Sequence, residues 1–172
     1  VLLAKDEFID EARIEEDAQP RHVPIKISYP GALDQNITFP VIFWSHGFGG
    51  SRDGAAFLAR YIASYGYILV HMTHFGTDSS LWEGQPGHPW DVLRKVKVRR
   101  QTTINRFKDI PFVLDQLKSG VLNKSEINKL ANYNLLGMSG HSFGSMTTQV
   151  IAGQRFPDRD QVLQDFSDLR FR

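Results

Sequence analysis

The sequence contains no cysteine, which excludes disulfides, thiolate metal sites and a cysteine nucleophile. No apolar run approaches the ~18 residues that a membrane-spanning helix needs, so we expect no transmembrane segment. Charge of one sign is not in excess either, because 20 Lys and Arg residues stand against 19 Asp and Glu. This balance gives no global electrostatic reason to expect a nucleic acid or an anionic membrane as a partner.

The rest of the composition is that of an ordinary globular protein. Hydrophobic residues make up 41% of the 172 residues, and there is no internal repeat or low-complexity tract. The length predicts one domain over residues 1–172. The first residue is Val1 rather than Met, and we expect that a segment upstream has been removed. Export with a removed signal peptide and a cytoplasmic location therefore both stay open.

The hydrophobic pattern predicts strands that alternate with helices. Continuously apolar runs at residues 39–44, 67–72 and 133–138 are typical of strands covered on both faces. Residues 22–29 alternate apolar and polar side chains, as a half-buried strand does. Helical spacing of apolar residues separates the strands and is longest over residues 91–117. The order predicts the α/β class, with a mostly parallel sheet and flanking helices.

Four local features carry further expectations. Residues 1–30 hold short apolar runs separated by acidic turns, and residues 73–90 resemble a long functional loop. Pro111 lies inside a helical pattern and predicts a kink or two helices. The helix expected at residues 53–64 has a face that we expect to be buried, formed by Phe57, Leu58, Tyr61 and Ile62.

The motif Gly140-His141-Ser142-Phe143-Gly144 stands between a predicted strand and a predicted helix. This G-x-S-x-G pattern is typical of a nucleophile elbow, in which a sharp turn exposes the serine hydroxyl above the sheet. Glycines two residues before and after the serine let the strand and the helix pass closely. We therefore expect Ser142 to be a catalytic nucleophile. The Phe143 amide is expected to point at the place where an oxyanion would form.

A second glycine-rich turn, His46-Gly47-Phe48-Gly49-Gly50, follows an earlier predicted strand. An acyl-transfer site needs another backbone donor besides the one after the serine, and a glycine-rich loop can approach the substrate closely. We expect the Phe48 amide to supply it. We expect His46 to hold the loop in place rather than to act as a base.

These motifs resemble the α/β-hydrolase superfamily, and more narrowly the bacterial predicted dienelactone hydrolases and the platelet-activating-factor acetylhydrolase group. The resemblance implies an α/β-hydrolase fold that hydrolyses a carboxylic ester with a short or oxidised acyl group, and it implies no metal or organic cofactor. It covers most of the chain, and the matching segments are residues 21–24, 29–30, 45–52, 66–67, 109–117 and 137–144.

The chain departs from that family in its catalytic base. The family order is nucleophile, acid and then histidine, yet only 30 of the 172 residues follow Ser142 and none is His. We expect His71, His74 and His88 not to replace it. Four later carboxylates are expected to be solvated surface acids, namely Asp158, Asp160, Asp165 and Asp168. The fold is thus expected to be truncated after the elbow helix, with the acid and histidine outside this chain.

Aromatic and basic residues around the long loop remain to be placed. Trp82, Trp90 and His74 are candidates for a substrate pocket, because ester sites need apolar walls, although the tryptophans can equally pin the loop. The basic run at residues 94–100 is expected to be a solvated helix face, since no aromatic stacking platform accompanies it.

Two classes of function follow. The first is a serine hydrolase acting on a small ester or lipid-like substrate, completed by further sequence or by a companion polypeptide. The second is a catalytically inactive α/β-hydrolase fragment that binds a ligand or a partner. Within the first class, the sequence leaves a peptide, a thioester or a dienelactone open as the substrate, because G-x-S-x-G serves all of them.

Overall fold

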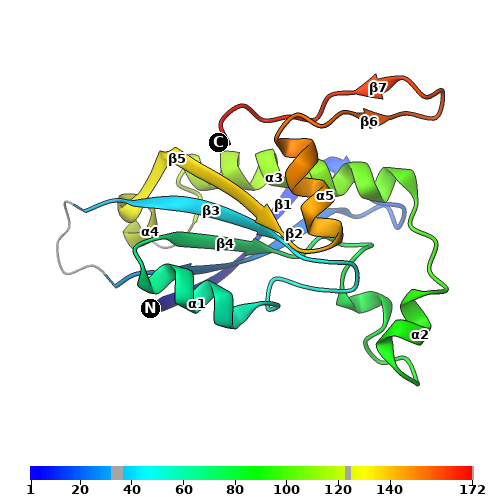
Figure 1. The fold of residues 1–172 in the computed structure, drawn as a ribbon, viewed down its shortest axis with the longest axis horizontal. Coiled ribbons are helices and arrows are strands. Elements are labelled where there is room, and N and C mark those ends of the chain that lie inside the picture. Colours follow the sequence, from blue (N-terminus) through cyan, green and yellow to red (C-terminus); the bar gives the residue numbers. More distant parts are fainter. Residues whose placement is uncertain (32–36, 123–124, 172) are drawn as a thin grey trace.

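The computed structural model describes residues 1–31, 37–122 and 125–171 and contains a five-stranded sheet flanked by helices (Figure 1). The sheet has the strand order β1-β2-β4-β3-β5. Its strands are β1 (Leu2–Ile14), β2 (Pro20–Tyr29), β3 (Phe39–Ser45), β4 (Ile68–Met72) and β5 (Ala131–Gly140).

The sheet is mixed in direction. Strands β3, β4 and β5 are parallel to one another, as the three apolar runs predict. Strand β2 runs antiparallel to both β1 and β4, so the sheet has an antiparallel part at one side. A short connection at residues 15–19 joins β1 to β2, and such a hairpin can only produce an antiparallel pair.

Helices cover the two faces of the sheet. Helices α3 (Arg100–Lys118) and α5 (Phe143–Ile151) lie on one face and α1 (Ala56–Ser64) lies on the other (Figure 1). Short helices η1 (Ser79–Leu81), α2 (Pro89–Leu93) and α4 (Ser125–Leu130) lie in the connections. After α5 comes a small two-stranded sheet, formed by β6 (Phe156–Pro157) and β7 (Leu163–Gln164).

The main core lies between the sheet and α3. Apolar side chains from every strand of the large sheet meet one face of this helix, and burying them supplies the main favourable term of folding. Its fully enclosed members include Val23, Ile25, Ile27, Val41, Phe43, Val70, Ile110, Val113, Leu114 and Leu117.

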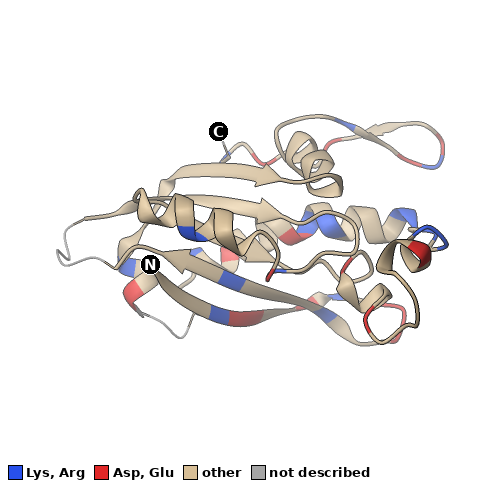
Figure 2. Ribbon diagram, turned by 60° about the horizontal axis from the view of Figure 1, so that its bottom comes forward, with Lys and Arg blue, Asp and Glu red and all other residues tan. Residues whose placement is uncertain are grey.

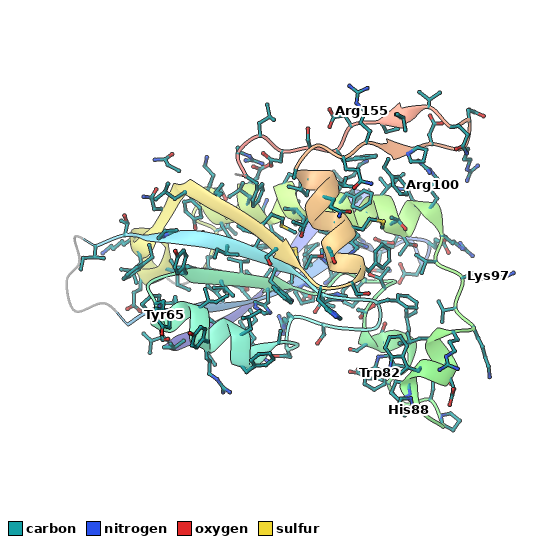
Figure 3. The ribbon with its side chains drawn as sticks, viewed as in Figure 1. Tyr65, Trp82, His88, Lys97, Arg100 and Arg155 are labelled. Carbon is teal, nitrogen blue, oxygen red and sulfur yellow. The ribbon has the colours of Figure 1, made fainter. Side chains whose placement is uncertain are left out.

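Charged residues are unevenly distributed over the strands and helices. Strands β3, β4 and β5 carry no Lys, Arg, Asp or Glu, whereas residues of both signs are interspersed along β1 and α3, and β2 carries Arg21 and Lys26 (Figure 2). Residues 94–100 are exposed or half-buried, as expected, but they form a turn and an extended connection between α2 and α3 rather than a helix face, and only Arg100 is helical. Lys97 points away from the body of the molecule in Figure 3. Within the described ranges, no helix has the length and hydropathy to cross a bilayer.

Three local expectations are wrong. Residues 2–14 form a single strand of 13 residues rather than short runs broken by acidic turns. Helix α3 continues through Pro111 as one helix, so the alternative of two helices is wrong, while the kink stays a prediction. Helix α1 exposes 73% of Phe57 and 62% of Tyr61, because the small side chains of Ala59 and Ala63 face the sheet and bring the helix close to it.

Candidate active site

The turn between β5 and α5 places Ser142 in a rare backbone conformation. Its φ is 54° and its ψ is −115°, a region that residues other than glycine seldom adopt. The side chain is exposed to solvent. Strain of this kind persists only where the surroundings hold it, and it is concentrated at functional sites. This strained turn lies between a strand and a helix, and the role of Ser142 as a nucleophile stays a prediction.

The two flanking glycines are required by contact with neighbouring backbone. A Cβ on Gly144 would stand 1.9 Å from the carbonyl oxygen of Ser45, at the end of β3. A Cβ on Gly140 would stand 2.4 Å from the carbonyl oxygen of Gly144. Real Cβ atoms do not approach backbone so closely, so both positions exclude every residue with a side chain.

The loop after β3 lies directly against the elbow. A Cβ on Gly47 would be 3.3 Å from the Cβ of Ser142 and 3.0 Å from Nδ1 of His141. The rings of Phe48 and Phe143 have centroids 6.4 Å apart. No described oxygen accepts the N–H of Phe48, and Phe143, as the first residue of α5, has no intrahelical acceptor. The Phe48 and Phe143 N–H groups therefore both lack a hydrogen-bond partner among the described residues.

Neighbouring residues fix the shape of this loop. The Gly50 N–H donates to the Gly47 carbonyl at 3.0 Å, and the Gly49 N–H donates to the Thr77 carbonyl at 2.8 Å. The indole Nε1 of Trp82 donates to the Gly49 carbonyl at 2.7 Å. This bond fastens the long loop that contains Trp82 to the glycine loop, and pinning the long loop is one of the two roles that the sequence left open.

Several solved structures share this architecture. A ferulic acid esterase from Streptomyces cinnamoneus matches with a TM-score of 0.62 at 17% identity, over 86% of this chain and 53% of the esterase. The hydrolase GrgF from Penicillium sp. matches with a TM-score of 0.54 at 13% identity, over 88% of this chain and 41% of that one. The chain has the α/β-hydrolase fold.

Two further comparisons bear on this hydrolase fold. Residues 22–83 match the family model of platelet-activating factor acetylhydrolase, isoform II. An acylaminoacyl peptidase from Pyrococcus horikoshii matches with a TM-score of 0.53 at 18% identity, over 85% of this chain and 20% of the peptidase. No curated protein matches the chain in sequence. The chain spans about half the length of the ferulic acid esterase.

Beneath the elbow of this α/β-hydrolase fold lies a buried ionic cluster. Arg21 Nη2 donates to Asp109 Oδ2 at 2.6 Å, and His74 Nδ1 donates to the same oxygen at 2.8 Å. All three side chains are enclosed. Burial alone would raise the pKa of Asp109, but the charge and hydrogen bonds of Arg21 hold that pKa well below its usual range.

Within this cluster a serine, a histidine and an aspartate are linked by a chain of hydrogen bonds. Ser45 Oγ donates to His74 Nε2 at 2.9 Å, and His74 in turn donates to Asp109. The order imitates a catalytic triad, yet both Ser45 and His74 are 0% exposed. A substrate cannot reach the Ser45 hydroxyl, so this arrangement is structural.

His46 connects the cluster to the glycine loop. Its Nε2 accepts the His74 N–H at 3.0 Å, so its ring proton lies on Nδ1, which donates to the Gly47 carbonyl at 2.6 Å. Burial, together with the nearby His74 and Arg106, lowers the pKa of His46 to about 2. The ring is neutral at pH 7 and both nitrogens are occupied. Its contacts favour the structural role expected for this histidine.

The expected pocket residues are not brought together. His74 has no exposed surface and uses both ring nitrogens inside the cluster, which corrects the expectation that it lines a pocket. Trp90 is 56% exposed. In Figure 3, Trp82 and His88 lie in the segment around α2 that projects from the sheet. A cavity of about 720 Å³ lies elsewhere, between the β1–β2 hairpin and the start of α3.

None of the six histidines is bonded to Ser142 in the described structure. His46 and His74 bond within the cluster, His22 pairs with Glu7, and His88 accepts the Trp90 N–H. His71 is buried, while His141 is exposed and follows the strand directly.

The sequence reasoning missed Arg106 and Asp109 as parts of the site. Both are 0% exposed, although they are charged. A signal was present, because they stand three residues apart along the apolar face that contains Thr103, Ile110 and Leu114. Charged side chains on the buried face of a helix need internal partners, and that requirement predicts a polar cluster.

Proposed function

We propose that the protein hydrolyses carboxylic esters through an acyl-enzyme on Ser142. The observation that carries this proposal is the conformation of Ser142, whose side chain is exposed at a turn with a strained, positive φ and with Gly47 packed beside it. The elbow leaves its hydroxyl open to solvent, in contrast to the buried Ser45.

The reaction has two stages on these residues. Ser142 Oγ attacks the carbonyl carbon of the ester while a base takes its proton. The carbonyl oxygen becomes an oxyanion that accepts hydrogen bonds from the Phe48 and Phe143 N–H groups. The intermediate collapses, the C–O bond of the ester breaks, and the alcohol leaves with the proton. Water then attacks the acyl-enzyme in the same way and releases the carboxylic acid.

The base and its acid partner are proposed to come from sequence outside residues 1–172. Support comes from the described histidines, none of which is bonded to Ser142, and from the coverage of about half of the ferulic acid esterase. Among the histidines of residues 1–172, His141 is the alternative base to test first, because it adjoins the serine and is exposed.

The proposed substrate is a small ester or lipid-like ester with a short or oxidised acyl group. The match of residues 22–83 to platelet-activating factor acetylhydrolase, isoform II, supports this class. The half-buried rings of Phe48 and Phe143 beside Ser142 would give an acyl chain apolar contact. No metal or organic cofactor is required by the steps above.

The test measures hydrolysis of p-nitrophenyl acetate, butyrate and palmitate by the natural protein that contains this chain. Ser142→Ala is expected to lower kcat on the order of 10⁴-fold or more, in the range found when a nucleophile is removed. Ser139→Ala, three residues earlier on β5, is the matched control and should retain turnover. Equal turnover in wild type and Ser142→Ala would overturn the proposal and favour the inactive, ligand-binding alternative.

The origin of the base is tested separately. Denaturing intact-mass analysis of the active sample shows every polypeptide present, including any companion chain with a histidine and an acid. His141→Gln should keep kcat within a few-fold if the base lies elsewhere. A loss of 10³-fold or more in His141→Gln would instead identify His141 as the base.

A further inference from the structure

Arg106 is a fully buried arginine whose guanidinium reaches several segments at once. It is 0% exposed, and its Nε donates to Thr147 Oγ1 at 2.9 Å. Its Nη1 donates to Thr77 Oγ1 at 2.8 Å, and its Nη2 donates to Ser45 Oγ at 2.8 Å and to the His46 carbonyl. The planar fork of an arginine supplies these divergent donors, which a lysine cannot.

The acceptors of Arg106 are all uncharged. Among the described residues no carboxylate forms a salt bridge with it, whereas the other enclosed arginine, Arg21, is paired with Asp109. Burying a cation is costly unless hydrogen bonds satisfy it. Burial lowers the pKa of Arg106 to about 9, so the side chain still carries its charge at pH 7.

The contacts of Arg106 fall on both sides of the candidate site. The His46 carbonyl belongs to the peptide unit that leads into Gly47 and Phe48. On the other side, the guanidinium carbon lies 4.6 Å from the centroid of the Phe143 ring, and Thr147 lies one turn further along α5. One rigid group therefore contacts the glycine loop and the first turn of the elbow helix.

We propose that Arg106 is a positioning residue that holds the Phe48 and Phe143 N–H groups in register for one oxyanion. This inference rests on the ester hydrolysis proposed above. The two donors come from segments about 95 residues apart, and the guanidinium bonds to one segment and lies against the other. Because the oxyanion exists only in the transition state, misplacement of the donors lowers kcat and leaves KM unchanged.

The kinetic test compares Arg106→Lys and Arg106→Met in the natural protein that contains this chain. Both should lower kcat per folded site by about 10²-fold with KM within about twofold, since small displacements of an oxyanion donor have effects of this size. Arg106→Lys keeps the charge without the fork and should not restore kcat. An unchanged kcat per folded site in both variants would overturn the inference.

A milder pair covers the case in which the arginine variants do not fold. Thr147→Val removes the acceptor on α5 with little change of volume, and about a tenfold fall in kcat is expected. Thr103→Val is the matched control, because it removes a buried hydroxyl of α3 whose single hydrogen bond among the described residues is to the Arg99 carbonyl. Equal kcat in these two variants would contradict the proposed link between Arg106 and α5.

Amide hydrogen exchange gives a reading that does not depend on turnover. In Thr147→Val, and in the arginine variants if they fold, exchange should become faster in residues 46–50 and 143–147 together, with Thr103→Val unchanged. If the wild type shows no ester turnover, the proposed function fails. Faster exchange of residues 46–50 and 143–147 together would then still show whether Arg106 holds the two segments in register. Exchange that stays unchanged in both segments would refute the positioning role of Arg106 even if Ser142→Ala abolishes turnover.

Discussion

The carbonyl oxygen of Ser45 lies against Gly144 so closely that a Cβ on Gly144 would stand 1.9 Å from it. This contact brings the end of β3 onto the first turn of α5. The glycine loop continues from β3, and the candidate nucleophile precedes α5 directly. The distance between the two motifs is therefore set by backbone against backbone, with no side chain between them.

Gly144→Ala should separate these two elements. The new methyl group cannot be accommodated without moving backbone, so we expect a loss of about 3 kcal/mol or more in the free energy of unfolding. Ester turnover should fall with it. Gly137→Ala is the control, because its Cβ would meet Ile42 at an ordinary 3.5 Å. Urea unfolding of both variants checks this, and equal stabilities would contradict the close contact.

Asp109→Asn should be strongly destabilising. The change removes the buried carboxylate that pairs with the enclosed Arg21, which keeps only its contact with the partly exposed Glu15, and breaking a buried pair in this way costs about 3–5 kcal/mol. Asp115→Asn on the same helix is the control, since it breaks a surface pair with Arg170 worth about 0–1 kcal/mol. Chemical denaturation of the two variants measures the difference in their free energies of unfolding. Similar losses in both would show that the buried pair of Asp109 contributes no more to stability than the surface pair.

Buried neutral histidines make the protein less stable in mild acid. Burial lowers the pKa of His71 to about 4, and the pKa values of His46 and His74 are lowered too. The unfolded chain takes up these protons near pH 6.5, whereas the folded chain does not. Stability is therefore complete above about pH 6.5 and is lost as the pH falls toward the folded values.

This pH effect can be assigned to one residue. Between pH 7.5 and 5.5 each such histidine should contribute about 1.4 kcal/mol to the loss. His71→Gln should remove about that much of the pH dependence. Unfolding free energies at the two pH values test this, and identical pH dependence in wild type and His71→Gln would contradict it.

Trp82→Phe should loosen the glycine loop. The variant keeps most of the ring volume but loses the hydrogen bond from Nε1 to the Gly49 carbonyl. A single hydrogen bond contributes about 1 kcal/mol, so a fall of about fivefold in kcat is expected. Trp90→Phe, which alters an exposed ring, is the control and should keep kcat. An equal kcat for the two variants would show that Trp82 does not support the loop.

The sequence was most informative where burial is uniform. The apolar runs that form β3 and β4 lie inside the sheet and are buried or half-buried at every residue, and such strands are recognisable from their composition. The third apolar run forms β5 at the edge of the sheet, where Asn134 and Leu135 are exposed and only Leu136 is buried, so the expectation that both of its faces are covered is wrong. Strand β1 was missed because most of its 13 residues are exposed or half-buried, which leaves only weak alternation. Edge strands of this kind are specified by their neighbour rather than by their own pattern.

Packing decided the features that the sequence did not predict. The face of α1 was assigned by the larger side chains, yet Ala59 and Ala63 contact the sheet while Phe57 and Tyr61 point to solvent. Similarly, the apolar face of α3 concealed Arg106 and Asp109, whose partners lie on other elements. Both depend on contacts between distant segments, which periodicity within one segment does not report.

The central measurement is the identity of the residue that carries the acyl group. The natural protein that contains this chain would be treated with a fluorophosphonate ester probe, digested, and mapped by mass spectrometry. We predict stoichiometric labelling of Ser142 that prevents ester turnover and is absent in Ser142→Ala. Turnover without labelling of Ser142, or labelling of another serine in step with inactivation, would contradict the assignment of Ser142 as the nucleophile.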